Sequence, residues 1–147
     1  MLMNLAIGLP TMLVCLILQV AVTFWCLSYY VRQSSRKPFG GRWFEGIRPL
    51  LMVMIAMVLG NFVQIMIWGV IFIWLGEFNE LYEAVYHSAV NFTSLGYGDV
   101  VMSKRWKLLG PLESANGILM LAITGAALMA ILQQLIKAQS DFIKQQE

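Results

Sequence analysis

Three long runs of hydrophobic residues dominate the pattern along the chain. They extend from about Leu5 to Val31, from about Leu50 to Leu75, and from about Leu112 to Ile136. A helix needs about 20 apolar residues to cross the hydrocarbon core of a bilayer, and each run meets that length. No Lys or Arg lies inside any run, and their one acid, Glu113, stands at the start of the third. The pattern therefore predicts three transmembrane helices.

The first run is predicted to be a retained helix rather than a signal peptide. A signal peptide opens with positive charge and ends in small residues at a cleavage site. Residues 1–4 carry no charged side chain, and the run ends in Tyr29-Tyr30-Val31. Basic residues at three-residue spacing are absent, so the helix is not a voltage sensor. We expect it to pack around the second helix or against lipid.

A more polar segment, residues 76–110, separates the second run from the third. Asn79 is a suitable N-cap for a helix over Glu80–Thr93, which would be about 21 Å long and too short to span the bilayer. Gly96 and Gly98 follow that helix at once. A short helix followed by glycine-rich backbone predicts a re-entrant loop, which is tolerated at membrane depth only inside protein or along a water-filled path. This segment is therefore expected to line a pore or to be buried.

Composition supports lipid as the main solvent. Hydrophobic residues make up 59% of the chain and charged residues 12%, whereas soluble domains have about 25% charged residues. A net charge of +2 is too small to indicate nucleic-acid binding. Cys15 and Cys26 would lie about 16 Å apart on one helix, too far for a disulfide. His87 is the one histidine, so no metal-ligand cluster is predicted.

Basic residues in the loops predict the orientation. Short cytoplasmic loops carry an excess of Lys and Arg. The loop between the first two runs holds five basic residues, namely Arg32, Arg36, Lys37, Arg42 and Arg48. The segment between the second and third runs holds three basic residues against four acids. We therefore expect a multi-pass protein of the cell (inner or plasma) membrane, with its N-terminus outside and its C-terminus in the cytoplasm.

Other polar and aromatic residues have candidate roles within this arrangement. Aromatic residues near the ends of the runs are expected to form interfacial belts: Trp25, Tyr29, Tyr30 and Trp43 on one side, and Trp68, Trp74 and Trp106 on the other. Asn61 and Gln64 share one face of the second helix. They are predicted to bond to neighbouring helices, with a role in gating as the alternative.

The segment Thr93-Ser94-Leu95-Gly96-Tyr97-Gly98-Asp99 resembles the selectivity filter of potassium channels, usually written T-V-G-Y-G-D. The resemblance implies that backbone carbonyls of Ser94, Leu95, Gly96, Tyr97 and Gly98 from four chains bind dehydrated K⁺. The Ser94 hydroxyl would be the innermost ligand, where the family usually has Thr. Thr93 and Asp99 would support the filter, Tyr97 would pack outward against the pore helix, and Asp99 would attract cations to the outer mouth.

The resemblance continues on the short helix before the filter. Ala84-Val85-Tyr86-His87-Ser88 fits the family pattern A-L-W-W-S, with Tyr86 and His87 in place of the tryptophans that support the filter. Val90 stands where several family members have a buried glutamate. Glu113 or Asn116, on the third helix, would substitute for that glutamate from the side. His87 is expected to brace the filter, with a proton-sensing role as the alternative.

The third helix resembles the inner helix of these channels, in which a glycine acts as a hinge. Counting from Gly98 favours Gly117, whereas counting from a helix start at Pro111 favours Gly125, which we prefer. The alternative is that both glycines only permit close packing. Met129 and Gln133 share the face of Gly125, and a ring of Met129 side chains is a candidate gate.

These observations predict an all-α membrane protein with three transmembrane helices, a re-entrant pore helix and a filter loop. Residues 1–31 form the extra N-terminal helix, 32–49 a basic cytoplasmic loop, 50–137 the pore domain, and 138–147 a short cytoplasmic tail that continues the third helix. Because one chain supplies one filter strand, a homotetramer in the lipid bilayer is expected.

The predicted function is passive, potassium-selective conduction, with K⁺ as the permeant ion. Two alternatives stay open: a non-selective cation channel on the same scaffold, and a non-conducting membrane partner subunit. No nucleophile, base and orienting group converge on one face, so no enzyme and no small-molecule substrate other than ions is predicted.

Overall fold

The computed structural model describes the backbone of residues 1–36 and 43–144. This part of the chain forms four helices, α1 (Leu2–Arg36), α2 (Trp43–Trp74), α3 (Leu81–Phe92) and α4 (Leu109–Lys144). No strand occurs in these two ranges, so the predicted all-α fold is confirmed. α4 begins two residues before Pro111 and continues into the polar tail, as predicted.

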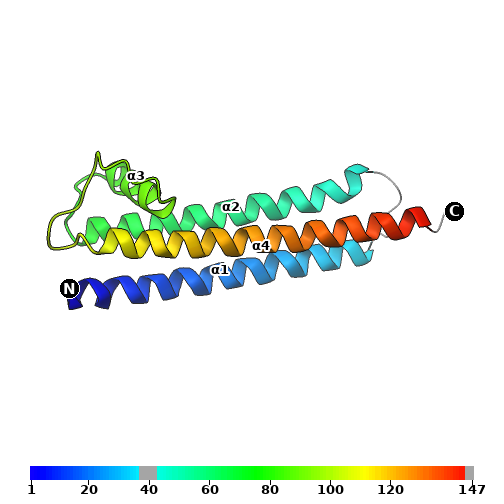
Figure 1. Ribbon diagram of the computed structural model, residues 1–147, viewed down its shortest axis with the longest axis horizontal. Helices are drawn as coiled ribbons and strands as arrows, with labels where there is room; N and C mark the ends of the chain where they lie inside the picture. Colours follow the sequence, from blue (N-terminus) through cyan, green and yellow to red (C-terminus); the bar gives the residue numbers. More distant parts are fainter. Residues whose placement is uncertain (37–42, 145–147) are drawn as a thin grey trace.

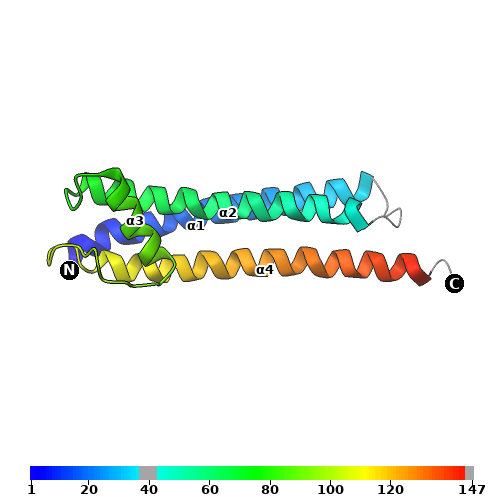
Figure 2. The same cartoon turned by 90° about the horizontal axis from the view of Figure 1, so that it is seen from above.

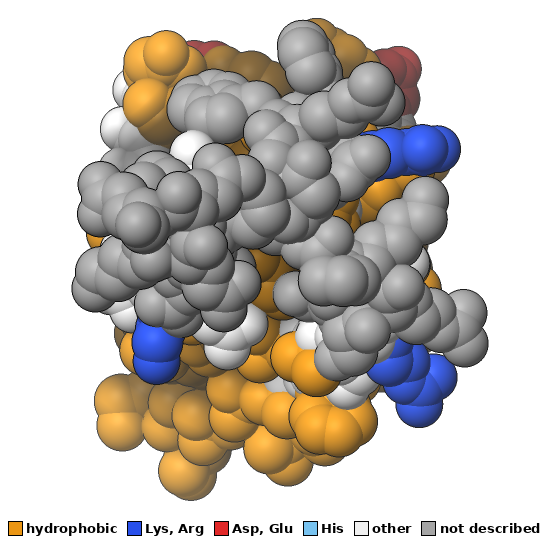
Figure 3. Space-filling model, turned by 90° about the vertical axis from the view of Figure 1, so that its right-hand side faces the viewer, with side chains coloured by type: hydrophobic (Ala, Val, Ile, Leu, Met, Phe, Trp, Pro, Cys, Tyr) orange, Lys and Arg blue, Asp and Glu red, His pale blue; other side chains and the backbone are white. Residues whose placement is uncertain are grey.

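Three of these helices are long and apolar enough to cross a membrane, which confirms the three predicted spans. Their qualifying segments are Leu2–Gln33, Ile47–Trp74 and Leu109–Lys137. Large hydrophobic side chains on all three helices are exposed. Figure 3 views the bundle from the end where α1 and α4 finish and α2 begins, with hydrophobic side chains covering the visible flank and Lys and Arg side chains near the rim. Such a surface suits lipid as the surrounding solvent.

The long helices run side by side (Figures 1 and 2), with α2 antiparallel to α1 and α4. α1 and α3 each pack against both α2 and α4, and they do not pack against each other. The prediction that the first span packs around the second is therefore incomplete, because α1 also lies along α4. The N-terminus and α3 occupy one end of the bundle, and the last turns of α1 and α4 and the first turn of α2 occupy the other (Figure 1).

Some of the aromatic residues that were predicted to lie at the membrane interfaces are instead buried in the core of the bundle. Trp68 is fully buried at the α3 end of the bundle, together with Phe72 and Trp106. Tyr30 is buried in a second cluster, with Cys26 and other α1, α2 and α4 side chains. The belt prediction is therefore wrong for Tyr30, Trp68 and Trp106, because each packs against a neighbouring helix. Trp43 lies outside the side chains that the structure describes.

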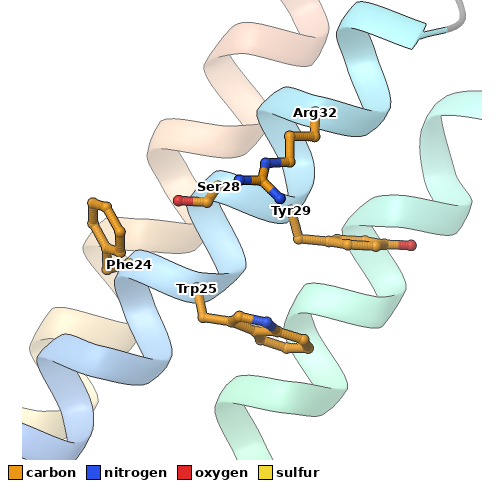
Figure 4. Close-up of a pocket in the computed structure, with 5 residues that line it drawn as sticks. All are labelled: Phe24, Trp25, Ser28, Tyr29 and Arg32. Atoms are coloured by element: carbon orange, nitrogen blue, oxygen red, sulfur yellow. The ribbon is translucent and has the colours of Figure 1, made fainter.

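Trp25 and Tyr29 do face outward from α1, as an interfacial position requires. Their rings stack with centroids 6.2 Å apart. They line a hollow of about 290 Å³ together with Phe24, Ser28 and Arg32. Figure 4 shows Trp25 and Tyr29 pointing to the same side of α1, with Phe24 on the other side. All five side chains come from one helix, so the hollow is a feature of the outer surface and not of a path through the bundle.

A buried polar network joins α1, α2 and α4 near the middle of the bundle. Gln64 Nε2 on α2 donates to Gln19 Oε1 on α1 at 2.7 Å. Gln19 Nε2 donates to Thr124 Oγ1 on α4 at 2.9 Å, and Asn61 Nδ2 donates to the same oxygen at 3.3 Å. The prediction that Asn61 and Gln64 bond to neighbouring helices is confirmed. Their partners Gln19 and Thr124 were not singled out from the sequence.

This network leads to a stability prediction. Gln19→Leu and Gln64→Leu each remove the direct Gln19–Gln64 bond, so their effects on unfolding should not add. We expect a coupling of about 0.6–2 kcal/mol between them in a double-mutant cycle, the range for interhelical bonds in membranes. Reversible unfolding in detergent, followed by tryptophan fluorescence, measures it.

Phe62→Leu is the matched control, because Phe62 is an exposed side chain on α2. It should show no coupling to Gln19→Leu. Additive effects of the two glutamine substitutions would contradict the prediction.

Candidate functional site: the pore helix and the filter strand

α3 is a short helix that enters the bundle and does not cross it. Its N-cap is Glu80, whose side chain makes no capping hydrogen bond. The prediction that Asn79 caps the helix is therefore wrong by one residue. The chain then turns back to the same end of the bundle before α4 begins (Figures 1 and 2). α3 and the segment that follows it thus have the predicted re-entrant arrangement.

The end of α3 is closed by a Schellman motif, after which residues 94–98 begin. These residues are the predicted selectivity filter; they are called the filter strand below, although they do not form a β-strand. Thr93 is the C-cap, and its hydroxyl donates to the carbonyl of Ala89 at 2.7 Å. The amide of Ser94 donates to the carbonyl of Asn91 at 2.8 Å, and the amide of Leu95 donates to that of Val90 at 2.9 Å. These are the two bonds of the motif, whose first residue beyond the cap takes a left-handed conformation. Ser94 has φ +59° and fills that position.

The filter strand alternates the sign of φ from one residue to the next. φ is positive at Ser94, Gly96 (+60°) and Gly98 (+74°), and it is not positive at Leu95 or Tyr97. Helices and β-strands keep one sign of φ, so this backbone is neither. Glycine accepts positive φ without steric cost, whereas Ser94 does so under strain that the Schellman motif imposes. Tyr97 is 68% exposed, so its own pore helix does not cover it.

The outer end of the filter is tied to α3 by Tyr86. The Tyr86 hydroxyl donates to Asp99 Oδ2 at 2.7 Å. This bond favours the charged carboxylate, so it holds the pKa of Asp99 below its ordinary value. The same bond raises the pKa of Tyr86. Asp99 is therefore an anion held in place at the exposed end of the strand.

His87 ties the residue after Asp99 to the buried face of α3. Its Nδ1 lies 2.9 Å from the Val100 carbonyl oxygen, which can only accept, so Nδ1 carries the hydrogen. Its Nε2 then accepts from Asn91 Nδ2 at 2.9 Å. The ring packs against Phe72 and Phe78, with centroids 5.5 and 5.1 Å away. Burial lowers the pKa of His87, which favours the neutral ring that these two bonds require.

Glu113 on α4 is fully buried against the inner side of α3. Its Oε1 is hydrogen-bonded to Ser88 Oγ at 2.5 Å, and its Oε2 accepts from Asn91 Nδ2 at 3.2 Å. Ser88 and Asn91 were not identified from the sequence as partners, although they share one face of the short helix with His87. Asn116 has no hydrogen-bond partner on α3 among the described residues. Of the two expected substitutes for a pore-helix glutamate, only Glu113 forms hydrogen bonds to α3 among the described residues.

The two inner-helix glycines have different surroundings. A Cβ added to Gly117 would overlap the carbonyl oxygen of Phe92, the last residue of α3. A Cβ added to Gly125 would meet nothing within 4 Å in the single chain. α4 continues as one helix through both positions. Met129 and Gln133 are exposed on the face of Gly125. Close packing therefore accounts for Gly117, while the hinge at Gly125 and the gate at Met129 and Gln133 stay predictions.

A family model described as "Ion channel" matches residues 50–134, more than half of the chain. The chain belongs to this ion channel family. The matched range includes α3, the filter strand and most of α2 and α4, and it leaves out α1. Comparisons with curated proteins and with solved structures find no match. Membership in an ion channel family supports ion transport across a membrane as the function of the chain.

The contact at Gly117 predicts that this ion channel tolerates a methyl group poorly there. Gly117→Ala should lower the free energy of unfolding by about 1–3 kcal/mol, because the helix backbone must move away from Phe92. Gly125→Ala is the matched control and should not destabilise the chain, since no atom lies near its Cβ position. Thermal unfolding in detergent compares the two. Equal stability of the two variants would show that α3 and α4 do not meet as described.

The Tyr86–Asp99 bond predicts a shift in titration. Tyr86→Phe removes the donor, so the pKa of Asp99 should rise towards its ordinary value and the carboxylate should become protonated at a higher pH. A carbon-13 NMR titration of the Asp99 carboxyl measures the midpoint. Tyr82→Phe is the control, because Tyr82 is exposed on the same helix and should leave the midpoint almost unchanged. An unaltered midpoint in Tyr86→Phe would rule out the bond in solution.

Proposed function

We propose that the chain is a subunit of a potassium-selective channel in which four copies surround one conduction path. The observation that carries this proposal is the backbone of residues 94–98, which alternates the sign of φ directly after a short, capped, re-entrant helix. Irregular backbone at membrane depth needs protein or water around it. A strand of this kind, with the sequence Gly-Tyr-Gly-Asp, is suited to present carbonyl oxygens to a dehydrated cation.

Each part of the site contributes to cation conduction in this proposal. The carbonyls of residues 94–98 and the Ser94 hydroxyl replace the water around K⁺. The C-terminal end of α3 carries partial negative charge and points at the inner end of the strand. Asp99, kept ionised with the help of Tyr86, raises the local concentration of cations at the outer end. Conduction is passive and follows the electrochemical gradient.

The surface of the single chain supports a symmetric assembly. One chain supplies one filter strand, and every residue from Thr93 to Asp99 is exposed. Leu95 and Tyr97 are 57% and 68% exposed, although both side chains are large and one is wholly apolar. Neighbouring copies around a four-fold axis would cover these side chains and complete the ring of carbonyls. Met129 and Gln133, on the exposed face of α4, would then line the inner part of the path.

The arrangement of the helices agrees with an outward-facing filter. The N-terminus lies at the filter end of the bundle, whereas the last turn of α1 and the first turn of α2, which flank the basic loop in the sequence, lie at the opposite end (Figure 1). If basic loops stay in the cytoplasm, the filter end and the N-terminus face outward and the C-terminus faces the cytoplasm.

Reversal potentials in mixed K⁺ and Na⁺ solutions test the proposal. The purified chain is reconstituted into bilayers, and its oligomeric state in detergent is measured in parallel. We expect a tetramer whose reversal potential follows the K⁺ gradient. Equal K⁺ and Na⁺ permeability would favour a non-selective cation channel on the same scaffold. A tetramer that passes no barium-sensitive current would favour a non-conducting partner subunit.

A further inference from the structure

The interface between α3 and α4 contains a chain of hydrogen bonds that ends beside the filter strand. It starts at Glu113 on α4, passes through Asn91 and His87 on α3, and reaches the carbonyl of Val100, directly after Asp99. Asn91 has two amide hydrogens, and both are used: one bonds to Glu113 and the other to His87. The position of the His87 ring therefore depends on Asn91, and that of Asn91 depends on Glu113.

Glu113 is an unusual group to find at this place. Its side chain is fully buried, and its carboxyl is hydrogen-bonded to Ser88 and Asn91, both uncharged. A buried carboxyl is costly unless its hydrogen bonds are satisfied. A purely apolar contact would pack α3 on α4 at lower cost. Packing alone therefore does not account for a carboxyl at this position.

The bonds of Ser88 indicate which chemical group this position needs. The Ser88 hydroxyl has one hydrogen, and its oxygen lies 2.8 Å from the Ile65 carbonyl oxygen and 2.5 Å from Glu113 Oε1. A carbonyl can only accept. When Ser88 donates to Ile65, its bond with Glu113 needs a hydrogen from the Glu113 side, while Oε2 still accepts from Asn91. A planar group that carries one donor and one acceptor meets both requirements. The side-chain amide of glutamine is also such a group.

We propose that Glu113 is a positioning residue of the filter, acting from the inner helix through Asn91 and His87 on the carbonyl of Val100. The expected effect of Glu113 on selectivity rests on the proposed function, whereas its role in positioning α3 and Val100 does not. The hydrogen-bond chain fixes the rotation of α3 about its own axis, because Ser88 and Asn91 lie on the face that Glu113 contacts. It also connects the first turns of α4 to the outer end of the strand, so the inner helix and the filter are mechanically linked at this point.

Three substitutions test this role. Glu113→Met removes both bonds and keeps a flexible side chain of similar size, whereas Glu113→Gln keeps one donor and one acceptor. Asn116→Leu is the matched control, since Asn116 is buried on the same helix but bonds to no α3 residue. Hydrogen exchange of the α3 amides is measured in the reconstituted protein, together with the ratio of K⁺ to Na⁺ permeability.

We expect Glu113→Met to raise α3 exchange roughly tenfold, which corresponds to about 1.4 kcal/mol, and to lower the permeability ratio. Glu113→Gln and Asn116→Leu should resemble the unmodified chain in both measurements. Unchanged exchange and permeability in Glu113→Met would overturn the inference. The inference would also be overturned if Glu113→Gln changed exchange and permeability as much as Glu113→Met does. In that case the donor and acceptor that glutamine keeps would not preserve the position of α3 or the selectivity.

A second variant keeps the test decisive if Glu113→Met does not fold. His87→Phe keeps an aromatic ring against Phe72 and Phe78 but removes both ring nitrogens. It should raise exchange at residues 100–102 and lower the permeability ratio, with α3 exchange unchanged. Unaltered exchange at residues 100–102 would overturn the link. If the unmodified tetramer passes no K⁺ current, the proposed function fails, and the exchange measurements alone then decide the role of Glu113.

Discussion

The contact between α3 and α4 is the constraint on which the rest of the site depends. The carbonyl of Phe92 lies against Gly117, where no side chain fits. The Ser114 hydroxyl donates to the Asn91 carbonyl at 2.9 Å, which is also the carbonyl that the Ser94 amide bonds. The inner helix thus holds the last turn of α3 at backbone level, and the filter strand begins from that fixed turn. A displacement of α4 at this contact would displace the start of the strand.

Polar groups, rather than a larger apolar core, hold this bundle in register. Lipid tails are as apolar as leucine side chains, so burial of leucine gives no preference for one helix arrangement over another. The structure places hydrogen bonds where specificity is needed: the Gln19, Gln64 and Thr124 network across the long helices, and the Glu113 bonds beside the filter. Individually these bonds are weak, but each is satisfied in one rotational setting of the helices. The extra helix α1 takes part through Gln19 and so belongs to the packed unit.

The sequence predicts the main elements well because their signals are local. Three apolar runs, a short polar helix and the Gly96 and Gly98 positions each lie within contiguous residues, and lipid as solvent leaves few alternatives for such runs. The prediction failed where the neighbour of a side chain decides its environment. Trp68 and Trp106 have the sequence positions of interfacial residues, yet both are buried against other helices. The hinge question was likewise unanswerable from spacing, since Gly117 is explained by an atom of Phe92 that is distant in sequence.

By itself, the sequence determined the three spans, the re-entrant segment and the filter motif, because the length of a hydrophobic run and the conformation of glycine depend on contiguous residues. Only the tertiary structure decided which polar groups meet. Gln19 and Thr124 are 105 positions apart, and Ser88 and Glu113 are 25 apart. Their pairing depends on how each helix is rotated about its axis, and packing against the other helices sets that rotation. The same packing made Glu113, an isolated acid at the start of a hydrophobic run, the hydrogen-bond partner of α3, the short helix before the proposed filter.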